Sequence, residues 1–227
     1  MIDQKIFKAA DKVCAILPEL NSTAYREATI RDLLDMRTGV TFVEDYLATS
    51  GLMIDYRKAT NWNPLENNES PSDLRSFYRL LDKKSHPDGK QFNYVSPNSD
   101  LLGWIIERST GERFSDLLSD LFWKPLGATM PSYITVDRLG APRVAGGLCT
   151  TAIDLALVGQ LFLDYGFTNG RQILPKNWLQ DIRENGSRGA WLEGNFAEYF
   201  PNTDMHYRSK WYVDHGSNDS KAELVFG

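Results

Sequence analysis

The sequence predicts an α+β fold, with helices through most of the chain and the beginning of a sheet near its C-terminal end. Side chains that cap helices precede apolar residues at helical spacing from about residue 29 to about residue 185. After about residue 208, short runs of β-branched and aromatic residues are separated by a polar turn. We therefore expect a single domain over residues 1–227, with a helical region at about 29–185 and the start of a sheet at about 208–227.

The composition is that of an ordinary globular protein and disfavours several kinds of partner. Of the 227 residues, 42% are hydrophobic and 24% are charged, and the formal net charge is −5. No cluster of basic residues exceeds a short run such as Lys83-Lys84, so nucleic acid is not an expected partner. No apolar run approaches the ~20 residues that span a bilayer, so no membrane span is expected.

Cysteine usage and the first residues say little about chemistry or compartment. Cys14 and Cys149 are too few for a disulfide framework and lack metal-ligand spacing, so we expect two buried thiols. No metal or organic cofactor is implied. Met1 to Lys5 lack the basic and apolar stretches of a signal peptide, which would favour the cytoplasm if Met1 were the true start. The compartment and the oligomeric state stay open.

The first third of the chain is expected to alternate loops with one short helix. Residues 6–20 are expected to form a loop that leads to a surface segment. Thr29 predicts the cap of a helix over residues 30–36, with Asp32 three residues after it. Residues 41–69 show no sustained period and contain several aromatic side chains, so we interpret them as a long functional loop.

Two serine–proline pairs predict the next helix starts. Ser70-Pro71 is expected to begin a helix that reaches Lys83-Lys84, and Ser96-Pro97 a second one that ends at Thr110-Gly111. The remaining elements are a helix at 114–122, a helix after Thr151 with one apolar side, a short helix near Pro175, and strands at 211–213 and 224–226.

Tyr94 is the most suggestive single residue, because it lies two residues before the helix that Ser96 is expected to cap. Its phenol would then lie near free backbone N–H groups and the positive end of the helix dipole. Such surroundings could lower the pKa of a tyrosine and suit proton transfer. The alternative is that Tyr94 is a half-buried packing residue and Ser96 is only a cap.

Four segments in order resemble the serine β-lactamase-related, or penicillin-recognising, hydrolases. They are Thr29-Ile30-Arg31-Asp32-Leu33-Leu34-Asp35-Met36-Arg37-Thr38-Gly39-Val40, then Phe92 to Gly111 with Trp123-Lys124-Pro125-Leu126-Gly127-Ala128, then residues 145–156, which begin Ala145-Gly146-Gly147, and Asn169 to Pro175. Together they cover most of residues 16–226. The resemblance implies the helix-rich middle portion of the serine β-lactamase/DD-peptidase fold, with most of the central antiparallel sheet missing at both ends.

Within that family the chain looks closest to the 6-aminohexanoate-dimer hydrolases and related esterases. The likeness rests on Val43-Glu44-Asp45-Tyr46 and Tyr94-Val95-Ser96, and residues 195–212 extend it. In the family a serine attacks an amide or ester carbonyl, a lysine one helical turn later keeps it deprotonated, and a tyrosine carries the proton to the leaving group. The resemblance therefore implies a small-molecule amide or ester substrate.

Carried over to this sequence, the resemblance makes Tyr94 the proton shuttle. Tyr46 would close over the substrate, and Ser96 would be a polar contact beside the nucleophile. Position 145 lines the cleft in relatives and is often polar; here it is Ala145, which leaves the substrate preference open.

The nucleophile motif Ser-x-x-Lys does not occur in these residues. Ser72 and Ser76 are each followed three positions later by arginine, which cannot act as a base. The family's third motif, Lys/His-x-Gly, is expected after Gly227; residues 215–217 imitate it but are interpreted as a turn.

We therefore expect a fragment of a serine hydrolase that is inactive by itself, with poorly covered apolar faces at Leu155/Phe162 and residues 224–226 and low solubility. The alternative is a non-catalytic binding protein derived from the same fold.

Overall fold

The computed structural model describes residues 1–216 and 224–226. In that part of the chain the fold combines helices and small antiparallel sheets, as predicted, but four short strands also lie inside the region 29–185 that was expected to be helical. The helices are α1 (Val13–Ile16), η1 (Pro18–Leu20), α2 (Ile30–Leu34), α3 (Leu52–Ala59), α4 (Leu74–Phe77), η2 (Tyr78–Leu80), α5 (Ser96–Thr110), α6 (Phe114–Leu118), η3 (Ser119–Trp123), α7 (Lys124–Leu126), α8 (Ala152–Leu163), α9 (Lys176–Glu184), α10 (Arg188–Leu192) and η4 (Ala197–Tyr199). The strands are β1 (Tyr133–Ile134), β2 (Leu148–Cys149), β3 (Phe167–Thr168), β4 (Arg171–Gln172), β5 (Met205–Arg208), β6 (Trp211–Asp214) and β7 (Leu224–Phe226).

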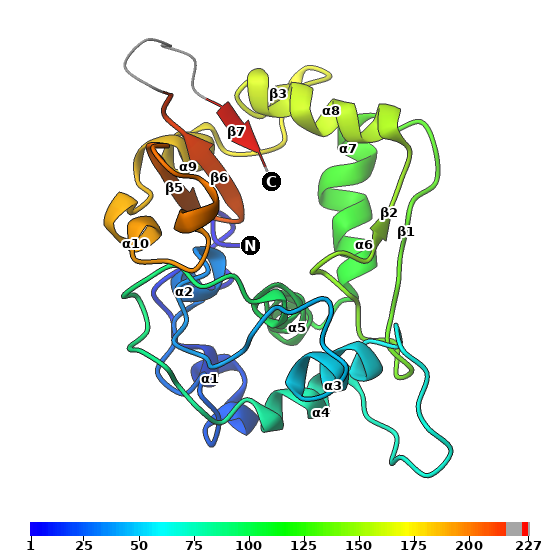
Figure 1. Cartoon of the computed structure of the whole chain (residues 1–227). Helices are drawn as coiled ribbons and strands as arrows, with labels where there is room; N and C mark the ends of the chain where they lie inside the picture. The colour runs from blue at the N-terminus through cyan, green and yellow to red at the C-terminus, as the bar shows by residue number, and fades with distance from the viewer. Residues whose placement is uncertain (217–223, 227) are drawn as a thin grey trace.

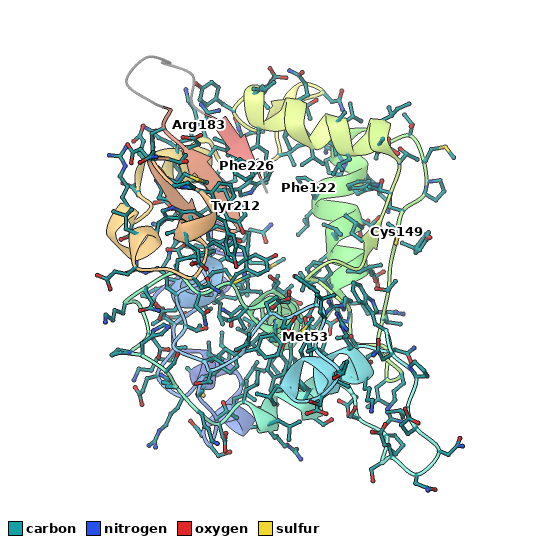
Figure 2. The ribbon with its side chains drawn as sticks, viewed as in Figure 1. Met53, Phe122, Cys149, Arg183, Tyr212 and Phe226 are labelled. Atoms are coloured by element: carbon teal, nitrogen blue, oxygen red, sulfur yellow. The ribbon has the colours of Figure 1, made fainter. Side chains whose placement is uncertain are left out.

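Helix α5 lies near the middle of the molecule, and other elements surround it (Figure 1). Helices α1 and α2 pack against α5, while the sheet β5-β6-β7 stands above them beside α9 and α10. Helices α6, α7 and α8 form the other side of the molecule, which we call the arm (residues 114–172). Figure 2 shows Tyr212 and Phe226 on the sheet, with Phe122 on the arm opposite.

The predicted helix ends at Thr29, Gly111 and Thr151 are confirmed. The Thr29 side chain accepts a hydrogen bond from Asp32 N–H, and the Asp32 side chain accepts one from Thr29 N–H. Gly111 closes α5 with φ +74°, a left-handed conformation that glycine adopts at little cost. The Thr151 side chain accepts from Asp154 N–H at the start of α8. Local capping chemistry therefore places three helix boundaries correctly.

Three predictions in the first third of the chain are wrong. Residues 6–20 do not lead to a surface segment: Val13 and Leu17 are fully buried, since α1 and η1 belong to the main core. The long loop at 41–69 contains α3, whose Met53 and Tyr56 face that core. The helix expected at Ser70 begins at Leu74, because Asp73 rather than Ser70 provides the cap. Helices thus begin well before the expected residue 29.

The C-terminal sheet contains one strand more than the sequence predicted. Strand β5 pairs with β6, with Tyr207 opposite Tyr212, and β6 pairs with β7, with Val213 opposite Val225. The sheet therefore begins at Met205, slightly before the expected residue 208. Its residues contribute to two smaller buried clusters, one around Phe92 and Trp191 and another around Leu179 and Val213.

The arm is much less buried than the rest of the described chain. Helix α8 does not present a single buried apolar side: Leu161 is covered, but Ile153, Leu155 and Leu163 are 73%, 57% and 66% exposed. The expectation of an uncovered face is correct for Leu155 and wrong for Phe162, whose ring lies 3.9 Å from the Trp211 ring. Within the described residues, no part of α6, η3 or α7 belongs to any of the three buried clusters.

Among residues 1–216 and 224–226, no helix combines the length and the apolar character needed to cross a membrane. Cys14 and Cys149 are both free thiols, as expected, but they are only partly buried.

Candidate active site

Tyr94 lies just before α5, and its side chain is half-buried. The ring stacks on Phe196 with centroids 5.2 Å apart and 14° between the planes. Its backbone N–H donates a hydrogen bond to Asn195 Oδ1 at 3.2 Å. Within the described part of the chain, the phenol oxygen has no hydrogen-bond partner. The ring is therefore held in place while its hydroxyl is left available.

Glu44 occupies the N-terminus of α5. Its Oε2 accepts a hydrogen bond from Ser96 N–H at 3.0 Å, and its Oε1 accepts one from Ser96 Oγ at 2.5 Å. Ser96 is the first residue of the helix and not its cap; the cap position is Val95, which offers no side-chain acceptor. The predicted cap is thus wrong, because a carboxylate from a distant segment takes that role and is favoured there by the helix dipole.

Tyr46, in the loop that precedes α3, contacts the same Glu44 carboxylate. Its hydroxyl donates to Glu44 Oε1 at 3.1 Å, and its ring is 60% exposed. Partial burial, reinforced by the Glu44 charge, raises the pKa of Tyr46 to about 12. Arg57 Nη2 donates to the Tyr46 carbonyl oxygen at 2.5 Å and so holds the loop from α3. Glu44 therefore brings together two of the predicted site residues, Tyr46 and Ser96.

The electrostatic surroundings of Tyr94 differ from the expectation. Burial raises the pKa of the Tyr94 phenol, the nearby Glu44 carboxylate raises it further, and the Arg143 guanidinium opposes both. The helix N-terminus was expected to lower this pKa, but Glu44 offsets its positive end. At neutral pH the Tyr94 phenol is consequently protonated and suited to donating a proton.

Ala145 is connected to the same helix by a different route. Its N–H donates to Asp100 Oδ1 at 2.7 Å, and Asp100 lies on α5 four residues after Ser96. The other oxygen, Oδ2, contacts Arg143 Nη1 at 3.1 Å and accepts from the Tyr56 hydroxyl at 2.5 Å. Desolvation of the buried carboxylate raises the pKa of Asp100, and the Arg143 charge acts against that rise. Ala145 thus joins the site region through a buried polar cluster.

The sequence interpretation did not single out Glu44, Asp100 or Arg143 as site residues. Of these three residues, only Glu44 could have been identified from the sequence, since it belongs to the Val43–Tyr46 segment that supports the family resemblance. Asp100 and Arg143 have no pattern around them in the sequence that indicates a buried pair, yet their side chains are 0% and 6% exposed. Their pairing spans 43 residues and only the folded structure shows it.

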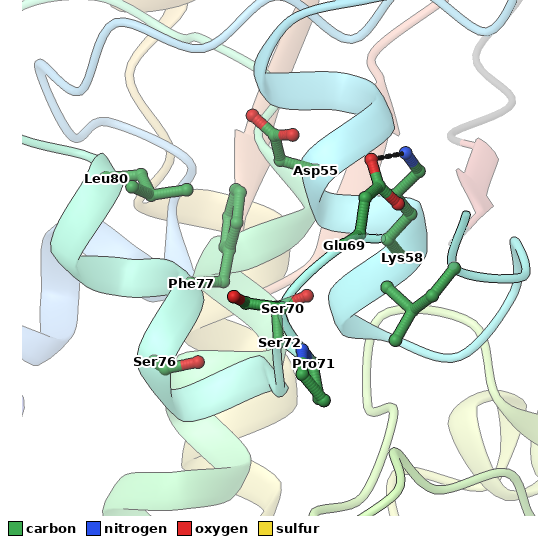
Figure 3. A pocket seen from close by; sticks show the side chains of 10 residues that line it. Asp55, Lys58, Glu69, Ser70, Pro71, Ser72, Ser76, Phe77 and Leu80 are labelled. Atoms are coloured by element: carbon green, nitrogen blue, oxygen red, sulfur yellow. Dashed lines mark hydrogen bonds and ion pairs between the residues drawn. The ribbon is translucent and has the colours of Figure 1, made fainter. Parts of the chain in front are cut away.

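An open pocket elsewhere contains none of these residues. It has a volume of about 330 Å³ and is lined by α3, α4 and the segment between them (Figure 3). The polar side chains that line it include Asp55, Ser70 and Ser76, together with the ion pair of Lys58 and Glu69. None of the four predicted site residues lines this pocket, so it gives no support to the predicted chemistry.

Residues 215–217 were interpreted as a turn rather than a catalytic motif. Gly216 has φ +75°, and its N–H donates to Asp214 Oδ1 at 2.9 Å, as in a turn. His215 Nε2 lies 2.9 Å from Nδ1 of the buried His206. Ser217 lies outside the described residues. In the described segments no group of three or more His, Cys, Asp and Glu side chains is arranged to hold a metal ion.

Comparison with known proteins identifies the family to which this chain belongs. The Beta-lactamase family model matches residues 1–219. The 6-aminohexanoate-dimer hydrolase of Paenarthrobacter ureafaciens is 31% identical over 212 residues, which are 93% of this chain and 53% of that protein. The chain therefore belongs to the Beta-lactamase family, and it spans about half the length of this curated relative.

Solved structures show the same fold. A candidate 6-aminohexanoate-dimer hydrolase from Bacillus anthracis superposes with a TM-score of 0.80 at 24% identity, over 95% of this chain and 54% of that one. A D-stereospecific amidohydrolase from Streptomyces sp. superposes with a TM-score of 0.66 at 18% identity, over 98% and 68% of the two chains. The mixed helices and small antiparallel sheets are thus those of β-lactamase-fold hydrolases.

Proposed function

We propose that residues 1–227 form the proton-transfer side of the active site of a serine hydrolase that cleaves a small-molecule amide or ester. The nucleophilic serine and its lysine belong to the protein outside these residues, because no Ser-x-x-Lys occurs within them. The proposal rests on one observation above all: a match to the Beta-lactamase family over residues 1–219 that includes Tyr94 just before α5.

The surroundings of Tyr94 suit this role. A proton donor must be protonated before the reaction and must have its hydroxyl accessible. Burial keeps the Tyr94 phenol protonated by raising its pKa, and stacking on Phe196 fixes the ring. Glu44 and Tyr46 lie next to it, at the end of the same helix. These side chains form a polar wall against which a substrate could bind.

The proposed chemistry is acyl transfer in two steps. The serine oxygen attacks the carbonyl carbon of the substrate, and the serine proton passes to the basic group beside it. The Tyr94 hydroxyl gives its proton to the leaving nitrogen or oxygen as the bond between that atom and the acyl carbon breaks. In the second step water attacks the acyl carbon and gives a proton to the Tyr94 oxygen, the bond between the acyl carbon and the serine oxygen breaks, and the serine takes its proton back from the basic group. Ala145, Tyr46 and Ser96 would contact the substrate.

Residues 1–227 alone are expected to be inactive. In serine hydrolases, loss of the nucleophile costs about 10⁶ in turnover, roughly 8 kcal/mol of transition-state stabilisation. A single correctly placed proton donor contributes only about 10²- to 10⁴-fold. Tyr94 cannot offset the missing serine.

The test compares Tyr94→Phe with the wild type in the protein expressed from its complete open reading frame. Hydrolysis of the 6-aminohexanoate dimer and of a p-nitrophenyl ester gives kcat for amide and ester cleavage. We expect the substitution to lower kcat by about 10²- to 10⁴-fold with little change in melting temperature. The effect should be larger for the amide, because an amine leaves less readily without a proton.

Tyr133→Phe is the matched control, since Tyr133 is 69% exposed on β1 and should leave kcat unchanged. Near-normal kcat in Tyr94→Phe would remove Tyr94 from the mechanism. Binding of the dimer without turnover by the wild-type protein would instead favour a non-catalytic binding protein derived from the same fold.

A further inference from the structure

A buried polar cluster connects three segments that are distant in sequence. Asp100 on α5 and Arg143 form an ion pair whose side chains are 0% and 6% exposed. The Tyr56 hydroxyl on α3 donates to Asp100 Oδ2 and accepts from Arg143 Nη1, both at 2.5 Å. A buried pair of this kind costs several kcal/mol in desolvation, and apolar side chains of similar volume would often be at least as stable. The contribution of this ion pair to stability therefore does not by itself explain why the charged residues are buried here.

The guanidinium of Arg143 is fixed in orientation as well as in charge. It lies over the Tyr56 ring at 4.6 Å and over the Trp62 ring at 4.4 Å. Trp62 follows α3, so both rings come from one short stretch of chain. A planar guanidinium held by two aromatic faces and a carboxylate has little rotational freedom.

The same cluster also binds the backbone of the segment that contains Ala145. Asp100 Oδ1 accepts the Ala145 N–H at 2.7 Å, so one carboxylate binds both Arg143 and Ala145. The segment also packs closely on α5: a Cβ at Gly103 would lie 2.5 Å from Val144 Cγ2. Residue 145 is therefore set at a fixed place beside α5, one helical turn beyond the end that bears Tyr94 and Ser96.

Helix α3 also holds the loop that carries Tyr46. Arg57, the neighbour of Tyr56, donates to the Tyr46 carbonyl oxygen at 2.5 Å. Two adjacent residues of α3 thus position the Tyr46 loop and the Ala145 segment.

We propose that Tyr56, Asp100 and Arg143 form a positioning cluster that sets the separation of residue 145 and Tyr46 from Tyr94, and with it the width of the substrate cleft. This inference rests on the proposed function. The cluster touches neither the substrate nor the reacting atoms; it acts through the backbone of residue 145. No apolar replacement would supply the carboxylate oxygen that binds the Ala145 N–H.

Hydrogen exchange in the protein from the complete open reading frame tests the structural part. Tyr56→Phe removes one hydroxyl and preserves the ring, so the protein should still fold. We expect amide exchange at residues 143–147 to accelerate about tenfold, as for the loss of one buried hydrogen bond, while exchange in β5 and β6 stays the same. Arg143→Met should have a larger effect, and Arg143→Lys, which keeps the charge, should restore part of the protection.

Arg208→Met is the matched control, because Arg208 is likewise a largely covered arginine in ion pairs, here with the two carboxylates of Asp35 and Asp181. It should lower the melting temperature and leave exchange at 143–147 unchanged. The functional readout is the ratio of kcat/KM for the amide and the ester. Tyr56→Phe should change that ratio at least about threefold, and Arg208→Met should not.

The positioning cluster is refuted if Tyr56→Phe and Arg143→Met lower the melting temperature but leave both exchange at 143–147 and the substrate ratio as in the wild type. Failure of the proposed function appears differently. In that case Tyr94→Phe retains full activity, whereas the exchange at 143–147 still responds to Tyr56→Phe.

Discussion

Tyr94 shows how a distant residue can reverse an inference from local sequence. A tyrosine before a helix N-terminus is expected to have a lowered pKa, because free N–H groups stabilise its phenolate. Here burial raises the pKa of the Tyr94 phenol, and the distant Glu44 carboxylate, which accepts the Ser96 N–H, adds a negative charge that raises it further. The residue keeps a chemical role in the proposal, but as a proton donor rather than as a phenolate.

Lys210 is a second residue whose charge is unfavourable in its surroundings. It follows β5 in the turn to β6, and its Nζ contacts Met36 Sδ at 3.4 Å. The side chain is half-buried, and its amine lies in densely packed surroundings. Desolvation lowers the pKa of Lys210 to about 7, although the charges of Asp35 and Asp100 oppose this.

Lys210→Met is therefore expected to stabilise the protein in a pH-dependent way. Between pH 7 and about pH 10.5 the unfolded chain binds a proton at this lysine and the folded chain does not. Wild-type stability thus rises with pH across this window. The gain in melting temperature from Lys210→Met should be largest below pH 7 and should shrink as the pH approaches 10.5.

Thermal unfolding at several pH values between 6 and 10 measures this difference. Lys8→Met serves as the control, since Lys8 is exposed and its replacement should give no pH-dependent difference. A melting-temperature difference for Lys210→Met that is constant across the range would show that the Lys210 amine is not desolvated.

At the scale of elements, local capping chemistry was predictable and long-range packing was not. Thr29 and Thr151 cap their helices as expected because both partners of each cap lie within three residues. Helix α3 was not predicted because its N-cap position is Gly51, which has φ +80° and provides no side-chain cap. The segment around it also lacks a clear hydrophobic period. The apolar residues of α3 pack against other helices, and this packing stabilises a helix for which the local sequence gives only a weak signal.

In the candidate site, too, the features that depend on local sequence could be predicted and the long-range contacts could not. The position of Tyr94 before α5 could be predicted, since it depends on the start of one helix. The contacts of Ser96 with Glu44 and of Ala145 with Asp100 join residues 52 and 45 positions apart. Neither pair has a pattern within a single element, so only the folded chain reveals them.

Asp154 joins two elements of the arm and gives a prediction at this scale. It lies in the first turn of α8 and accepts hydrogen bonds from the backbone N–H groups of Thr129 at 2.7 Å and Met130 at 3.2 Å. The Thr151 hydroxyl donates to it at 2.8 Å. These hydrogen bonds, the one from Thr129 N–H above all, lower the pKa of Asp154.

Asp154→Asn should free the 129–130 segment from α8. A lowered folded-state pKa means that the carboxylate stabilises the fold above its ordinary value of 3.8, and that this contribution is lost as the pH falls through the folded-state pKa. Amide exchange at Thr129 and Met130 should therefore be faster in the variant at pH 6, and the two proteins should converge as the pH falls through the folded-state pKa of Asp154. Equal exchange at pH 6 would contradict the hydrogen bonds.

At the scale of the whole molecule, burial is distributed unevenly. The main core surrounds α5, and the two smaller clusters lie beside the sheet. The arm joins the main core through Ala141 and the Arg143–Asp100 ion pair, and it joins the clusters beside the sheet through Phe162, which contacts Trp211. Isolated exposed apolar residues are normal on a protein surface, but α8 carries several of them on one short helix.

We expect this face of α8 to make residues 1–227 self-associate and poorly soluble. Covering an exposed Ile or Leu side chain is worth about 1.5–3 kcal/mol, so two such residues contribute about 3–6 kcal/mol and favour association at high protein concentration. Ile153→Glu combined with Leu163→Lys replaces the two most exposed of the three α8 side chains, which are 73% and 66% exposed. Each new charge also has the sign that the nearer helix end favours.

Size-exclusion chromatography with light scattering then reports the mass at increasing concentration. The double variant should shift the association constant by more than about tenfold towards monomer, while its helix content stays that of the wild type. Leu192→Lys is the matched control, because Leu192 is 70% exposed but lies on α10, away from the arm, and its replacement should leave association unchanged. A wild-type chain that is monomeric and melts cooperatively at high concentration would show that α8 needs no covering partner, and that the arm folds stably with its apolar side chains in water.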